Sequence, residues 1–291
     1  MIPPPFEYFA PQSMAEAIGL LQRYGTDGKL MAGGQSLIPL MKLRLASPSY
    51  VIDLQKVPGL STLEEHDGFL VIGTMVRESA LEHSPLVRSR YPGIAEASEV
   101  VADPVVRNFA TLGGNLAHAD PANDHPAMML ALRARVVATG PTGHRSISID
   151  DFLVDTFETS LDTDEVLVEI HVPQPAAHSG SAYVKFERKV GDYAVAAAAA
   201  QVTLQGDTCT QAGLGLTNVG PKAIRPVAAE QFLVGKRLDA QTIREAAKLA
   251  GDAAEPTSDL RGPAEYKRAV VRALTARALR KAAERAMGGA N

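Results

Sequence analysis

The sequence is poor in cysteine. Cys209 is the only cysteine in the 291-residue sequence. One thiol cannot form a disulfide within the chain, and it cannot supply the several thiolates that hold an iron-sulfur cluster. Any such cluster that works with this chain is therefore expected on another polypeptide.

A net positive charge and long apolar runs are also lacking. The formal net charge is -4 at pH 7, whereas a nucleic-acid-binding protein needs a basic excess to displace counterions from phosphates. We therefore expect no nucleic-acid partner. No run reaches the roughly 18 apolar residues of a transmembrane helix, and the opening MIPPPFEYFA lacks a basic segment followed by an apolar one. The sequence predicts a cytoplasmic protein, unless a partner carries it to a membrane.

The first part of the chain has the pattern of a small α/β unit. Ser13 and Glu16 form a capping box, and the apolar residues that follow recur at helical spacing until Gly25. The stretches KLMA and YVIDL are typical of short buried strands, with a Gly-Gly turn and a short helix between them. We assign residues 1–57 to this unit.

The rest of the chain divides at a linker. From FLVIGTMV onward, strands alternate with helical stretches and with a loop-rich segment from Asp103 to His125. PQPAAHSGS, residues 173–181, is rich in Pro, Ala and Ser and is typical of a linker. Beyond it we expect one sheet from AYVKFERK, AVAAAAAQVTLQ and TCTQAGLGLTNVG, then helices over 239–251 and 264–287. The sequence thus predicts an α+β protein with further units at 58–175 and 178–291.

A glycine-rich loop follows the KLMA strand. It consists of Ala32, Gly33, Gly34, Gln35 and Ser36. Small residues after a strand let the backbone approach a ligand and turn several N–H groups toward phosphate oxygens. Taken alone, the loop fits a plain tight turn as well as a phosphate site.

A second glycine pair repeats the design. Thr111, Gly113, Gly114 and Asn115 are followed by Asp124 in RNFATLGGNLAHADPANDHP. Two such loops could hold both ends of a pyrophosphate, while a carboxylate binds a ribose hydroxyl or an adenine amino group. The two loops together predict a dinucleotide ligand.

Other kinds of site are disfavoured by spacing. The sequence has no GxxxxGK[ST] motif, and GLGLTNVG lacks the spacing of a Rossmann fingerprint. His118, Asp120, Asp124 and His125 include ligand types for a metal, but the prolines around them indicate an extended loop, so we expect no metal site. Cys209 is expected as a buried apolar residue, and no GxSxG elbow is present. We assign no catalytic residue.

These motifs resemble those of a known family, the FAD-binding medium subunits of molybdenum hydroxylases, related to the flavin domain of xanthine dehydrogenase. Within it, the chain is most similar to the aerobic carbon monoxide dehydrogenase branch. The stretches that carry the resemblance span the chain: AGGQSLIPLMKLRLA, YVIDL, VVADPVVRNFATLGGNLAHADPANDHPA, FERKVGDYAVAAAA, GLTNV and RGPAEYKR. One departure is Gln35, where that branch has histidine, and it leaves the substrate open.

The resemblance implies a fold and a set of cofactor contacts. The expected fold is a vanillyl-alcohol-oxidase (PCMH)-type FAD-binding module of two α/β subdomains, followed by a domain with a small antiparallel sheet and helices. Asp192 and Tyr193 match a mobile segment near the isoalloxazine. The residues implied for FAD binding are Lys29, Leu30, Met31, Ala32, Gly33, Gly34, Gln35, Ser36, Leu37, Thr111, Gly113, Gly114, Asn115, His118, Asp120, Asp124, Leu167, Lys185, Asp192 and Tyr193.

The resemblance also implies a function and partners. The chain is expected to carry non-covalent FAD and to pass electrons to an external acceptor. A large subunit with the molybdenum cofactor and a small subunit with two [2Fe-2S] clusters are the expected partners, as a dimer of heterotrimers. Two alternatives stay open: a self-sufficient vanillyl-alcohol-oxidase-type flavin oxidase, and a flavin-free interaction scaffold.

Overall fold

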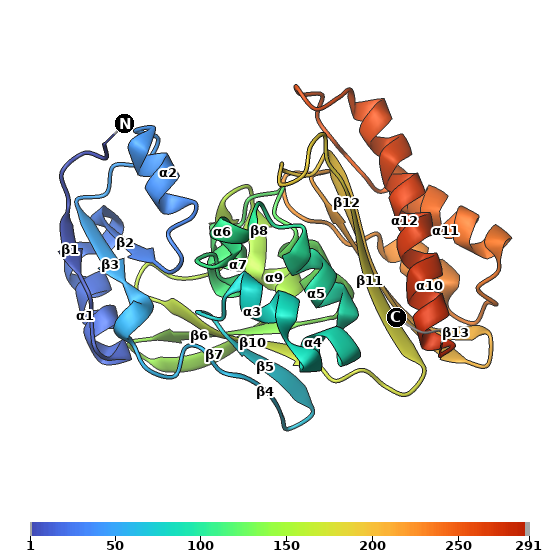
Figure 1. Ribbon diagram of the computed structural model, residues 1–291, viewed down its shortest axis with the longest axis horizontal. Helices are drawn as coiled ribbons and strands as arrows, with labels where there is room; N and C mark the ends of the chain where they lie inside the picture. The colour runs from blue at the N-terminus through green and yellow to red at the C-terminus, as the bar shows by residue number, and fades with distance from the viewer. Residues whose placement is uncertain (1, 289–291) are drawn as a thin grey trace.

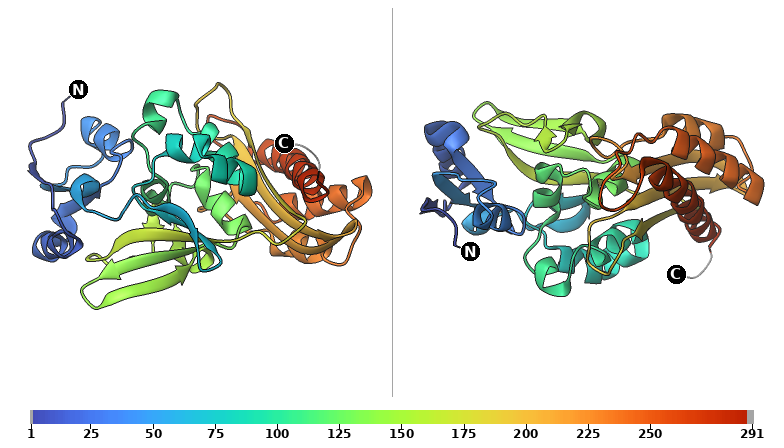
Figure 2. Two further views of the ribbon diagram at one scale, coloured as in Figure 1. Left: turned by 60° about the horizontal axis from the view of Figure 1, so that its bottom comes forward. Right: turned by 90° about the horizontal axis from the view of Figure 1, so that it is seen from above.

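Three main sheets follow one another along the long axis of the molecule (Figure 1). The computed structural model describes residues 2–288. The two further views in Figure 2 place the N-terminal unit and the C-terminal helices at opposite ends. Within the described residues, no helix is both long enough and apolar enough to cross a membrane.

The N-terminal unit is a parallel sheet with two helices. Ser13 Oγ accepts the Glu16 N–H at 3.2 Å, and Gly25 ends the helix with a positive φ of 52°, so the predicted first helix is confirmed. The strand order is β1-β3-β2, with both pairings parallel. Its elements are β1 (Glu7–Phe9), α1 (Met14–Tyr24), η1 (Gly25–Asp27), β2 (Gly28–Met31), α2 (Leu37–Lys42), β3 (Tyr50–Asp53) and η2 (Leu54–Lys56).

The second unit is an antiparallel sheet with helices above it (Figure 1). The strand order is β4-β5-β10-β6-β7, and apolar side chains between sheet and helices form one buried cluster. The strands are β4 (Leu63–His66), β5 (Phe69–Gly73), β6 (Arg135–Gly140), β7 (Gly143–Ser148) and β10 (Val166–Pro173), with a hairpin of β8 (Leu153–Asp155) and β9 (Glu158–Thr159). The helices are α3 (Glu78–His83), α4 (Pro85–Arg90), α5 (Pro92–Glu99), α6 (Pro104–Arg107), α7 (Leu112–His118), α8 (His125–Ala131) and α9 (Ile149–Phe152).

Two local predictions are wrong. The segment from Asp103 to His125 is less rich in loop than predicted, because it holds α6 and α7. The Asp103 side chain accepts the Val106 N–H at 2.9 Å, and Thr111 Oγ1 accepts the Gly114 N–H at 3.1 Å, so each helix has a side-chain cap. The linker is also shorter than predicted, since β10 includes Pro173 and the next strand begins at Ser179.

The third unit is an antiparallel sheet between two layers of helices. The order is β11-β12-β13; α12 packs on β11 and β12, while α8 packs on β13 and α5 on β11. The elements are β11 (Ser179–Phe186), β12 (Ala196–Gln205), β13 (Thr208–Thr217), α10 (Val227–Leu233), α11 (Ala240–Asp252) and α12 (Ala264–Ala286). This arrangement confirms the predicted α+β fold with a small C-terminal antiparallel sheet.

Close packing explains the alanine run of β12. The alanines at 196–200 are all fully buried, although alanine is a poor strand former. A Cβ at Gly180 on the neighbouring strand would lie 2.1 Å from the backbone oxygen of Ala282 on α12. Only small side chains fit between helices at this separation. Cys209 is buried in β13 as predicted, and burial raises the pKa of its thiol to about 11.

Candidate functional site

The first glycine loop presents a row of free backbone donors. It connects the carboxyl end of β2 to α2. The N–H groups of residues 33–37 donate to no acceptor within residues 2–288. Gly34 has a φ of +71°, and the Gln35 side-chain amide donates to the Gly33 oxygen at 3.0 Å, which holds the turn. Consecutive unpaired N–H groups of this kind bind anions.

The two glycine loops lie against each other, although they come from different units. A Cβ at Gly33 would lie 2.1 Å from the backbone oxygen of Phe109, and a Cβ at Gly114 would lie 3.5 Å from the Ala32 Cβ. Arg77 Nη1 donates to the Phe109 oxygen at 2.9 Å and holds this stretch. The lack of a side chain at Gly33 thus makes room for the neighbouring backbone. The sequence alone suggested only that it makes room for a ligand.

The second glycine pair differs from the first because it lies in the first turn of α7. The Gly113 N–H donates to the Thr74 oxygen at 3.2 Å, and the Asn115 N–H donates to the Thr111 oxygen at 2.9 Å. A Cβ at Gly113 would lie 1.8 Å from Thr74 Oγ1. The backbone donors here are already engaged. The Asn115 Oδ1 atom is buried and has no partner within the described residues.

Asp124 and Lys185 form a buried ion pair between the second and third units. Lys185 Nζ lies 3.1 Å from Asp124 Oδ2, and the Tyr183 hydroxyl donates to Asp124 Oδ1 at 2.7 Å. Burial raises the pKa of Asp124 above its usual range, against the opposite effects of Lys185 and Tyr183. Both carboxylate oxygens therefore have protein partners, and their direct contact with a cofactor stays a prediction.

Three further predicted residues have distinct surroundings. Asp120 Oδ1 accepts the Ala122 N–H at 2.9 Å. The His118 ring lies 5.1 Å from the Phe157 ring, and burial lowers the pKa of His118, with Asp120 opposing the shift. Leu167 is buried in β10 as part of the core of the second unit.

Asp192 and Tyr193 lie in the segment between β11 and β12. Tyr193 is 46% exposed. Burial of its hydroxyl is the main cause that raises the pKa of Tyr193, and the charge of Asp120 adds to the shift. The structure thus brings this segment of the third unit close to the loop that follows α7.

Sequence reasoning missed several residues that hold the site together. Asn218 donates from its backbone to the Pro121 oxygen at 2.9 Å and from its side chain to the Ala194 oxygen at 2.6 Å. Arg77, Tyr183 and Arg261 also hold neighbouring segments, through hydrogen bonds to Phe109, Asp124 and Asp192. Asn218 and Arg261 lie within GLTNV and RGPAEYKR, two of the stretches that carry the resemblance, but no spacing rule gives either residue a partner.

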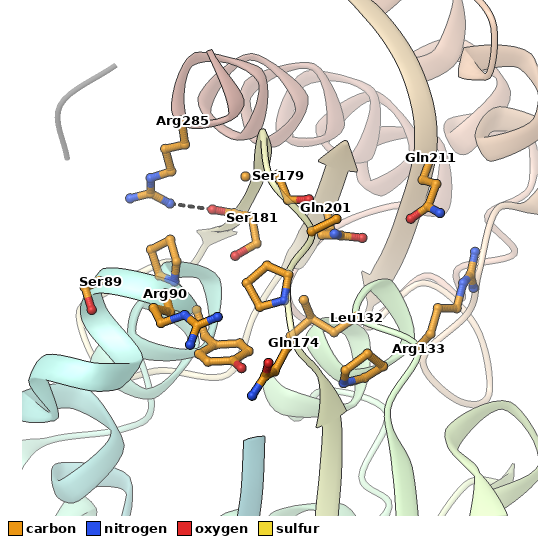
Figure 3. Close-up of a pocket in the computed structure, with 16 residues that line it drawn as sticks. Ser89, Arg90, Leu132, Arg133, Gln174, Ser179, Ser181, Gln201, Gln211 and Arg285 are labelled. Atoms are coloured by element: carbon orange, nitrogen blue, oxygen red, sulfur yellow. Dashed lines mark hydrogen bonds between the residues drawn. The ribbon is translucent and has the colours of Figure 1, made fainter. Parts of the chain in front are cut away.

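A separate hollow of about 370 Å³ lies between the second and third units (Figure 3). Its arginines are paired: Arg90 with Glu65, Arg133 with Glu230 and Arg285 with Glu96. Figure 3 shows Arg285 donating to the backbone oxygen of Ser181, at 2.6 Å. Among the described residues, its lining includes none of those predicted to bind the cofactor. The hollow is therefore distinct from the candidate site.

The donor chemistry of the site fits a dinucleotide. The free N–H groups of residues 33–37 can receive the oxygens of a diphosphate without a side-chain charge. The adjoining Gly114 carries no side chain that would cover them, and the buried Asn115 Oδ1 next to it is a further polar group without a partner among the described residues. These residues fit the FAD predicted from the sequence.

Comparison with known proteins agrees with this chemistry. The family described as FAD binding domain in molybdopterin dehydrogenase matches residues 4–175, and the CO dehydrogenase flavoprotein C-terminal domain matches residues 181–282. The carbon monoxide dehydrogenase medium chain of Hydrogenophaga pseudoflava is 45% identical, over 96% of this chain and 97% of that protein. The 6-hydroxypseudooxynicotine dehydrogenase complex subunit alpha of Paenarthrobacter nicotinovorans is 38% identical, over 98% and 97%.

A solved structure is similar over nearly the whole fold. A chain of carbon monoxide dehydrogenase from Hydrogenophaga pseudoflava, in a form that lacks the Mo-pyranopterin moiety, superposes with a TM-score of 0.95 at 46% identity, over 97% of this chain and 98% of that one. The chain therefore belongs to the family of FAD-binding medium subunits of molybdenum hydroxylases, and it is an oxidoreductase subunit of the carbon monoxide dehydrogenase type.

Proposed function

We propose that the chain is the flavin subunit of a cytoplasmic heterotrimeric unit that pairs into a dimer. The large partner holds the molybdenum cofactor and the small partner holds two [2Fe-2S] clusters. FAD supplies a carrier that accepts electrons from the clusters and donates them to an external acceptor. The observation that supports this proposal most is the row of free N–H groups at residues 33–37 beside the second glycine pair.

The chain's own residues bind and orient the cofactor in this proposal. The loop at 33–37 holds the diphosphate, and Gln35 keeps the loop in shape through its bond to the Gly33 oxygen. Asn115 adds a polar contact, while Lys185 and Asp124 fix the third unit beside the site. The full set of FAD contacts implied by the resemblance, and the unit limits 1–57, 58–175 and 178–291, are part of the proposal.

The oxidised substrate belongs to the large partner in this proposal. The two relatives above are named for different substrates, carbon monoxide and 6-hydroxypseudooxynicotine. Their similarity to this chain extends over the same flavin fold, which supports a shared role for the fold and a substrate chosen elsewhere. The single cysteine of this chain likewise supports clusters held by a partner.

Metal analysis of the complex tests the proposal. The affinity-tagged chain would be isolated from its native host with its partners. We expect about one molybdenum and about four irons per FAD, the content of one cofactor and two [2Fe-2S] clusters. Flavin without molybdenum or iron would count against the proposed complex and favour a self-sufficient oxidase.

A Gly33→Ala variant separates flavin binding from assembly. A Cβ at this position meets the backbone of Phe109 and must move the loop. We expect this variant to lose FAD while molybdenum and iron stay with the complex. Gly19→Ala is the matched control, because no atom lies within 4 Å of a Cβ there, and it should keep all three.

A further inference from the structure

An arginine from a distant part of the chain contacts the segment that carries Tyr193. Arg261 Nη2 donates to Asp192 Oδ1 at 3.2 Å, and its guanidinium carbon lies 5.7 Å from the centre of the Tyr193 ring. The Tyr193 N–H donates to the same Asp192 oxygen at 2.8 Å. One guanidinium thus contacts both a carboxylate and an aromatic ring, a combination that arginine makes better than lysine.

Arg261 is itself held by Asp259, which pairs with a buried lysine. Its backbone N–H donates to Asp259 Oδ1 at 2.8 Å, and Asp259 Oδ2 accepts from Lys267 Nζ at 2.8 Å. Lys267 lies on α12 and is only 1% exposed. Asp259 and Gly262 also exchange two backbone hydrogen bonds, at 3.2 and 3.1 Å. The turn that carries Arg261 is therefore fixed to the core of the third unit.

The Tyr193 segment has a second support on the other side. Gly191 has a φ of +83°, and a Cβ there would lie 2.8 Å from the backbone oxygen of Ala102 in the second unit. The segment thus lies between the second unit and the Arg261 turn. Arg188 also approaches Asp192, at 3.6 Å, but its side chain is 57% exposed, against 27% for Arg261. Exposed ion pairs of this kind contribute little.

We propose that Arg261 is a positioning residue that sets the place of the Tyr193 ring beside the cofactor site. The residues Lys267, Asp259, Arg261 and Asp192 form a latch, named here for the chain of contacts that runs from α12 to the Tyr193 segment. The role of Tyr193 toward the flavin rests on the proposed function. The latch itself rests on contacts within the chain, so each can fail without the other.

A fluorescent reporter tests the latch without flavin. The chain contains no tryptophan, so Tyr193→Trp introduces a single one at the position in question. Collisional quenching by acrylamide would be measured in the flavin-free full chain. In this background Arg261→Gln should raise the quenching constant of the introduced tryptophan about twofold or more, because the ion pair and the ring contact are both lost.

Two variants control for general disruption. Arg188→Gln removes the exposed arginine next to the same carboxylate and should leave the quenching constant unchanged. Arg261→Lys keeps the charge without the planar fork, so an intermediate value is expected. Should Arg261→Gln fail to fold, Asp192→Asn breaks the same contact from the other side and should raise quenching similarly.

The results separate the latch from the proposed function. Equal quenching in the Arg261→Gln and Arg188→Gln chains overturns the latch, whether or not the chain binds FAD. Quenching that rises only in the Arg261→Gln chain supports it. Titration of the reporter chain with FAD then tests the flavin role separately, and its failure would remove the proposed function while leaving the latch in place.

Discussion

His118 makes the free energy of unfolding depend on pH. Burial lowers the pKa of His118 below its ordinary value of 6.5, and Asp120 only partly opposes this. The unfolded chain therefore takes up this proton at a higher pH than the folded chain. The contribution of His118 to the free energy of unfolding is present above about pH 6.5 and is lost as the pH falls through that value.

Urea unfolding at about pH 8 and about pH 5.5 measures this effect. The parent chain should lose more of its free energy of unfolding over this range than His118→Gln, which has no titrating group at the position. The comparison cancels the carboxylates and the other histidines, because both chains share them. Equal losses in the two chains would contradict the assigned shift of His118.

Single residues also show where sequence reasoning stops. The sequence predicts Asp124 as a ligand for the adenosine end of the cofactor, because it follows the second glycine pair. In the structure its two carboxylate oxygens accept hydrogen bonds from Tyr183 and Lys185, which lie on β11 of another unit. Tyr183 lies 59 positions and Lys185 lies 61 positions after Asp124, so no local spacing rule predicts these contacts. The role of Asp124 as a cofactor ligand stays a prediction, and its protein partners cannot be predicted from the sequence.

At the scale of elements, the sequence predicts those helices and strands whose formation depends on neighbouring residues. Helix α1 follows from its Ser13 cap and its apolar spacing, and the strands β2 and β3 follow from their short apolar runs. The start of α7 at the second glycine pair could not be predicted in this way, because glycine disfavours helix. Gly113 is needed there for close contact with Thr74, which the end of β5 brings in from far along the chain. Tertiary packing overrode propensity at this point.

The contact between α8 and β13 makes an element-scale prediction. A Cβ at Gly215 of β13 would lie 1.9 Å from the Ala127 oxygen on α8, and this backbone cannot swing aside. Gly215→Ala should therefore lower the free energy of unfolding by about 1 to 3 kcal/mol, the usual cost of overpacking a core. Urea unfolding measures the change.

The matched control is again Gly19→Ala, on the exposed side of α1. No atom lies within 4 Å of a Cβ there, and alanine favours helix over glycine by up to about 1 kcal/mol. This variant should be as stable as the parent or slightly more stable. If Gly215→Ala proved equally harmless, the close packing of the third sheet on the second unit would be wrong.

At the scale of the whole molecule, the candidate site uses all three units. The first supplies the free N–H groups at 33–37, the second supplies the glycine pair of α7, and the third supplies Lys185 and the Tyr193 segment. The fold class could be predicted from the sequence because strands, turns and apolar faces are local patterns, and the pairing of the two glycine loops could be predicted because one pyrophosphate would use both. The Asp124 contacts could not, since they depend on how the third unit folds back onto the second. The latch could not either, since it joins Arg261 to Asp192, which is 69 positions away in the same unit.

Flavin content of the purified full chain tests the central claim most directly. The chain would be reconstituted with FAD, freed of excess cofactor, and its flavin measured before and after acid precipitation. We expect about one FAD per chain, released fully by acid, as for a cofactor held by backbone donors without a covalent bond. A Gly33→Ala chain should keep little of it, while the Gly19→Ala chain keeps all. No flavin in the parent chain, or flavin that stays with the acid-precipitated protein, would contradict the account.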